Sequence, residues 1–140
     1  MFRFLCFFLC LVGSLCTAAV RSASPEEAAK ETAKARLEVA RKGLAEAEKV
    51  IPGMSEDSAN IWIWSKRVLH AELACSTSKS ERITALEAHW RRAVRLEKLA
   101  EREYMQGRST RLILLEAVYR RLNVEAHLAG EKAKPELPRR

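Results

Sequence analysis

The stretch 76–96, STSKSERITALEAHWRRAVRL, decides the fold of this chain. It opens with Ser78 and Glu81, whose Ser-x-x-Glu spacing is that of a capping box, in which each side chain bonds a free backbone amide of the other residue. Apolar residues then recur every three or four positions, which places them on one face of a helix. The pattern predicts a long helix packed along one apolar seam: Ile83, Leu86, Trp90, Ala93, Leu96, Ala100 and Tyr104.

Two further helices are expected upstream. Ser24 followed by Pro25 predicts a helix start, because Ser caps free amides and Pro is tolerated in the first turn. This helix should stop near Pro52 and Gly53, and a second should begin at Ser55. The expected seams are Ala33, Leu37, Ala40, Leu44, Ala47 and Ile51 in the first helix, and Ile61, Trp64, Val68, Ala71 and Cys75 in the second.

A fourth helix is expected downstream. Gly107 can adopt the left-handed conformation that ends a helix, and Ser109 is the predicted cap of the next one. Gly130 and the prolines that follow are expected to close the helical region. The predicted seam of this helix is Leu112, Leu115, Tyr119, Leu122, Ala126 and Ala129.

The sequence therefore predicts an all-α fold of about four helices, built as antiparallel helical hairpins with coiled-coil-like packing. Two arrangements stay open. Two hairpins can fold together or stack end to end. Alternatively, the first helix continues into the second across Pro52, and the third into the fourth at Gly107, which gives one long hairpin bent at 76–80.

The first nineteen residues read as a signal peptide. Arg3 precedes an apolar run at 4–16, and small residues follow at 17–19, before the expected cleavage after Ala19. The apolar run is too short to span a bilayer comfortably, although an uncleaved anchor is the alternative. We expect an exported protein of the periplasm or cell envelope, with a single helical domain at 20–130 and a disordered basic tail at 131–140.

Cysteine usage fits this division. Cys6, Cys10 and Cys16 lie in the predicted leader, so Cys75 is the single cysteine of the processed chain. A disulfide within one processed chain is excluded, and a bridge between chains stays open in an oxidising compartment. The simpler interpretation of Cys75 is a small apolar residue near a helix end.

Composition and motifs argue against an enzyme. The 25 Lys and Arg residues exceed the 18 Asp and Glu residues by 7, but both signs are interspersed, as on solvated helix faces. The chain has no Gly-rich phosphate loop, no nucleophile elbow and no Cys-x-x-Cys. His70, His89 and His127 are isolated and are expected to be surface residues. We therefore expect no metal site, no cofactor and no catalytic residue.

Partner contact is the expected mode of action. Trp62 lies two residues from the seam residue Trp64 and so faces elsewhere, which makes it a candidate contact, with packing against a third helix as the alternative. The basic cluster of Arg91, Arg92 and Arg95 is the second candidate. Export makes nucleic acid a poor partner, so we expect a protein partner or self-association, or contact with an anionic envelope membrane surface. Because glutamates lie nearby, ion pairs at i, i+4 spacing are the simpler explanation for these arginines.

One segment resembles a known family. The turn at 104–109, YMQGRS, and the following Leu115-Glu116-Ala117 resemble the helical repeat of outer-membrane efflux proteins of the TolC type, although Ser109 follows Gly107 by two residues instead of three. The segment 86–128 is also similar to small exported helical proteins of unknown function. The resemblance covers roughly a quarter to a third of the chain. It implies a helical piece, adaptor or remnant of a trimeric transport conduit.

Together these observations predict a non-enzymatic exported helical-hairpin protein that acts through protein–protein association. The efflux resemblance implies a transport-associated role. A small envelope chaperone or stress-binding module, which would hold unfolded proteins on an apolar and basic face, is the alternative.

Overall fold

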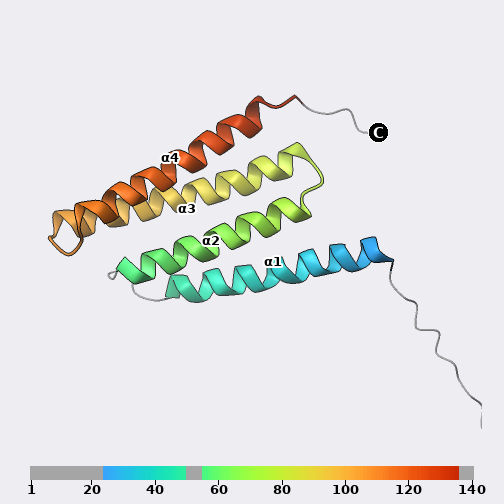
Figure 1. Ribbon diagram of the computed structural model, residues 1–140, viewed down its shortest axis with the longest axis horizontal. Coiled ribbons are helices and arrows are strands. Elements are labelled where there is room, and N and C mark those ends of the chain that lie inside the picture. The colour runs from blue at the N-terminus through green and yellow to red at the C-terminus, as the bar shows by residue number, and fades with distance from the viewer. Residues whose placement is uncertain (1–23, 50–54, 136–140) are drawn as a thin grey trace, which may run out of the picture.

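The computed structural model describes residues 24–49 and 55–135, which form four helices. They are α1 (Pro25–Lys49), α2 (Ser55–Cys75), α3 (Lys79–Met105) and α4 (Arg111–Ala133). The helices lie side by side in one layer, in chain order, and each runs opposite to its neighbour (Figure 1). The predicted all-α fold of antiparallel hairpins is confirmed. The predicted leader, Ile51 and residues 136–140 of the predicted tail lie outside the described residues.

The layer consists of two hairpins. α1 packs along α2, and α3 packs along α4, while the contact between α2 and α3 is less extensive. The alternative of one long bent hairpin is therefore wrong, because α2 folds back along α1 and α4 folds back along α3.

Side-chain caps start the first and third helices. The backbone N–H of Glu27 donates to Ser24 Oγ at 3.2 Å, and the backbone N–H of Ser24 donates to Glu27 Oε2 at 3.1 Å. Ser78 and Glu81 form the same reciprocal capping box at the start of α3, as predicted. Each box satisfies two backbone donors that the helix itself leaves free.

The turn between α3 and α4 differs from the prediction by one residue. Gly107 has a φ of 68°, the left-handed conformation expected for it. Thr110 caps α4, and its Oγ1 accepts from the backbone N–H of Ile113 at 3.4 Å. The prediction that Ser109 caps α4 is wrong, because the turn takes one more residue before the chain enters the helix.

Two apolar clusters form the core. The first joins α1, α2 and α3, and the second joins α2, α3 and α4. Burying each Leu, Ile or Val side chain contributes about 1.5 to 3 kcal/mol, so most of the predicted seam residues of α1, α2 and α3 hold the layer together. The predicted seam residue Tyr104 is 38% exposed instead, and Leu69 and Ala85 are buried outside the predicted seams. The buried members are Ala40, Leu44, Ile61, Val68 and Leu96 in the first cluster, and Leu69, Ala85, Leu86 and Leu128 in the second.

The predicted seam of α4 faces solvent. Its large members are 75% (Leu112), 52% (Leu115), 67% (Tyr119) and 51% (Leu122) exposed, and Ala126 and Ala129 are exposed as well. We call this row of six residues the α4 stripe. The prediction that the stripe packs against α3 is wrong.

Ion pairs explain the rotation of α4. Its opposite face, which carries Val124 and Leu128, is the one buried against α3. Arg121 pairs with Glu97 of α3 on that side, and Glu131 pairs with Arg82 of α3 at 2.6 Å. Both faces of α4 have apolar residues at helical spacing, so these cross-helix charges select the buried face.

α4 also runs past its expected end. Gly130 stays within the helix, which ends at Ala133. Glu131 is 6% exposed, and hydrogen bonds from Lys134 and Arg82 lower the pKa of its carboxyl. The Nζ of Lys79 donates to the carbonyl of Lys132 at 2.9 Å, which caps the helix end. The beginning of the predicted disordered tail is thus part of the fold.

Candidate functional site

The four residues predicted to contact a partner do not share one surface. Trp62 is half-buried between α3 and α4, as in the alternative of packing against a third helix. Arg92 turns into the α2–α3 interface, where its Nε donates to Ser65 Oγ at 2.7 Å. Arg91 and Arg95 are exposed on another side of α3, and Arg95 pairs with Glu48 of α1.

A buried polar cluster lies where the two hairpins meet. Ser65 of α2 is 0% exposed and His89 of α3 is 2% exposed. The Ser65 Oγ accepts from Arg92 Nε and shares a hydrogen bond with His89 Nδ1 at 2.7 Å. The Nη2 of Arg92 is buried without a partner among the described residues. Polar groups are therefore buried within the least extensive of the three main helix contacts.

Burial sets the charge state of this cluster. It lowers the pKa of His89 to about 4, with smaller effects from the positive charges of Arg92, His70 and Lys66. Burial also lowers the pKa of Arg92. His89 is therefore neutral at pH 7. The prediction that His89 is a surface residue is wrong, whereas His70 and His127 are exposed.

The Ser65 hydroxyl and the His89 imidazole are the groups of a nucleophile–base pair, but a substrate has no access to them. A hydroxyl within hydrogen-bond distance of a neutral imidazole is the arrangement that activates serine nucleophiles. Ser65 is fully buried, so no substrate reaches its Oγ in this conformation. The pair instead satisfies polar groups between two helices.

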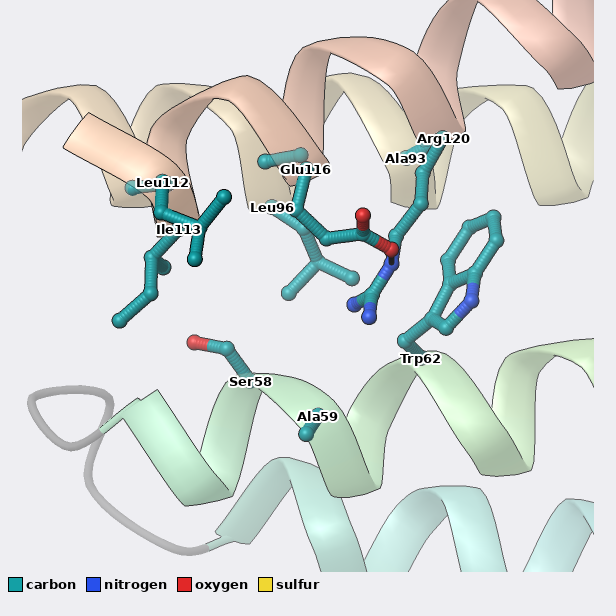
Figure 2. A pocket seen from close by; sticks show the side chains of 11 residues that line it. Ser58, Ala59, Trp62, Ala93, Leu96, Leu112, Ile113, Glu116 and Arg120 are labelled. Atoms are coloured by element: carbon teal, nitrogen blue, oxygen red, sulfur yellow. Dashed lines mark hydrogen bonds and ion pairs between the residues drawn. The ribbon is translucent and has the colours of Figure 1, made fainter. Parts of the chain in front are cut away.

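A groove runs between α2 and α4, with α3 as its floor. Figure 2 shows Arg120 reaching from α4 toward Trp62 on α2, beside Glu116. The Arg120 guanidinium carbon lies 5.3 Å from the Trp62 ring centre, and the ring stacks on His89 at 4.9 Å. Arg120 and Trp62 together line a largely apolar cavity of about 470 Å³ at the Ser58 end, and Trp62 also lines a second cavity of about 320 Å³ that includes His127.

A second groove carries positive charge. Arg91, Arg95, Lys98 and Arg102 follow one another at helical spacing along α3 and line a cavity of about 850 Å³ with Arg108. Two of these charges are neutralised, because Arg95 pairs with Glu48 and Arg108 with Glu103. The remaining positive charges attract anionic surfaces. Contact with an anionic envelope membrane surface therefore stays a prediction.

The α4 stripe is the feature whose role sequence reasoning missed. Its spacing predicts a core seam, but the pattern alone cannot say which of two apolar faces of a helix is buried. The charges on the opposite face were the available signal. Arg121 and Glu131 lie there beside Val124 and Leu128, and each finds an opposite charge on α3.

The described part of the chain offers no group of three His, Cys, Asp or Glu residues that could hold a metal ion. Among the described helices, none combines the length and apolar character that crossing a membrane requires. No protein-family model matches the sequence, and no curated protein or solved structure matches it either.

Proposed function

We propose that this protein is a non-enzymatic association protein and that the α4 stripe is its docking surface for a partner helix. The observation that carries the proposal is the exposure of four large apolar side chains in one row, each more than half exposed. Contiguous exposed apolar patches on soluble proteins usually mark interaction sites.

The stripe has the geometry that a helix partner requires. Its members are spaced by three and four residues, the repeat of a coiled-coil seam, over a length of about 26 Å at 1.5 Å per residue. α4 is already folded against α3, so docking pays no cost of helix nucleation. The small side chains of Ala126 and Ala129 let a partner backbone approach closely at one end.

The proposal places this association in the cell envelope, because the sequence of the first nineteen residues predicts export. A transport assembly is the class of partner that the efflux resemblance implies. The spacing of the α4 stripe suits a helix-to-helix contact, so a transport role would act through assembly.

In-cell photo-crosslinking tests the proposal. A photoreactive phenylalanine analogue is placed at position 119 or 122 in the chain expressed with its own leader in an exporting bacterial host. The matched control carries the analogue at Ala45, which is exposed on α1. We expect a discrete adduct from positions 119 and 122, mapped by mass spectrometry to a helical segment, and none from position 45.

Two results would contradict the proposal. One is the absence of any adduct from the stripe at native expression level. The other is a broad set of unrelated adducts, which would favour the chaperone alternative. Replacing Leu115 by Asp should abolish the adduct, whereas V39D, which adds a charge at an exposed apolar residue of α1, should leave it intact.

A further inference from the structure

We infer that the partner helix is α4 of a second copy of this chain, packed parallel and in register along the α4 stripe. This inference rests on the proposed function and adds the identity and direction of the partner.

The flanking charges complement themselves in a parallel pair. When Leu112 and Leu115 pack against their counterparts in a parallel pair, a residue that flanks the seam lies beside the residue five positions further along the other helix. These residues are Arg111 and Glu116. The two-fold symmetry of a parallel pair creates this contact twice, so each copy supplies one arginine and one glutamate.

Both groups are available for the contact. Arg111 is exposed on the first turn of α4. Glu116 is 52% exposed at its side chain and accepts from Arg120 of its own helix at 2.8 Å. A carboxylate accepts several hydrogen bonds, so Glu116 can also accept from a second guanidinium.

The antiparallel pair lacks this charge complementarity. Packing Leu112 against Ala129 of the other copy brings Arg111 near Lys132, whose Nζ pairs with Glu87 of α3 at 2.9 Å, so Arg111 gains no carboxylate from the other copy. Glu116 then faces the uncharged Asn123. The parallel pair brings Arg111 beside a carboxylate and this antiparallel pair does not, so charge complementarity favours the parallel direction.

The layer leaves room for the second copy. α4 lies at one edge of the layer (Figure 1), and the α4 stripe lies on the side opposite the residues that contact α3. Two copies related by an axis along α4 would therefore extend away from each other. Pairing stacks Tyr119 on its counterpart at the middle of the stripe, where aromatic contact adds to apolar burial.

A charge-swap series tests the inference on the chain purified as the exporting host processes it. Sedimentation velocity over a concentration series should show a monomer–dimer equilibrium for the natural chain. R111E and E116R should each weaken dimerisation about tenfold or more, because each brings like charges together. The double variant R111E/E116R should return the dissociation constant to within about threefold of the natural value. K34E, at an exposed lysine of α1, is the control and should change nothing.

Cysteine cross-linking tests the direction. In a C75S background, A126C alone should form an interchain disulfide, since a parallel pair brings the two copies of position 126 together. Cross-linking only between L115C and A126C chains would show an antiparallel pair and overturn the inference. Circular dichroism checks that every variant keeps its helices.

Other results separate the inference from the proposed function. A strict monomer at all concentrations would overturn the self-pairing, and a photo-adduct from position 119 to a different protein would then still support the proposed function. A trimer would also overturn the parallel dimer and would favour the efflux-type assembly. Loss of both self-pairing and photo-adducts would contradict both the inference and the proposed function.

Discussion

The Ser65 hydroxyl and the His89 imidazole hydrogen-bond across the α2–α3 interface, with 2.7 Å between Oγ and Nδ1. Both side chains are almost completely buried. Since α2 and α3 share the least extensive of the three main helix contacts, this pair helps to fix how the two hairpins sit against each other. The hairpin junction should therefore respond to changes in either residue.

Acid should weaken the fold through His89. Its pKa is about 4 in the folded chain, below its ordinary value of 6.5. Above pH 6.5 His89 is neutral in both the folded and the unfolded chain, so its titration does not change the free energy of unfolding there. As the pH falls from 6.5 to 4, the unfolded state takes up the proton first, so folding loses up to about 3 kcal/mol. Denaturant unfolding at pH 7, 5.5 and 4 measures the loss. H89Q should remove this component, and an equal acid response in H89Q and the natural chain would contradict the assignment.

Removing the Ser65 hydroxyl should destabilise the junction. S65A leaves the buried Nε of Arg92 without its acceptor, and the Nη2 of the same side chain already lacks a partner among the described residues. We expect the free energy of unfolding to fall by about 1 to 3 kcal/mol. S80A, at an exposed serine of α3, should change it by less than about 0.5 kcal/mol. Similar values for the two variants would show that the buried hydrogen bond contributes nothing.

The glycines of α1 and α4 should respond in opposite directions to alanine. A Cβ at Gly43 would lie 2.4 Å from Cε3 of Trp64, whereas a Cβ at Gly130 would meet nothing within 4 Å. G130A should raise the free energy of unfolding by about 0.5 to 1 kcal/mol, because alanine favours the helix. G43A should lower it by about 1 kcal/mol or more, since the clash outweighs the same gain. Thermal unfolding of both variants measures the signs, and stabilisation by G43A would mean that Trp64 moves aside without cost.

Removing the Trp62 ring should bring the pKa of His89 back toward its ordinary value. The Trp62 ring covers His89 at 4.9 Å, so W62A should admit water and raise the pKa of His89 from about 4 toward 6.5. NMR titration of the imidazole signals measures this value. W64A is the control, because the Trp64 ring lies against Gly43 of α1 and under Arg67. An unchanged pKa in W62A would show that the helices alone bury His89.

Much of the architecture follows from local sequence. The capping box of Ser78 and Glu81 starts α3 where its spacing predicts, and Gly107 ends the helix in the left-handed conformation. Both features depend mainly on neighbouring residues, so the local sequence predicts them. Arg92 shows the limit: its charge predicted a surface role, but its hydrogen bond to Ser65 comes from another helix.

The sequence by itself determined that the described chain is helical, where its helices begin and end to within a few residues, and one buried face each of α1, α2 and α3. Tertiary structure alone decided that α4 buries the face of Val124 and Leu128 and exposes the α4 stripe, and that His89 lies between the hairpins. The physical reason is that helix formation and capping depend on residues within one or two turns. The rotation of a helix with two apolar faces, in contrast, depends on charges carried by a different helix, here Glu97 and Arg82.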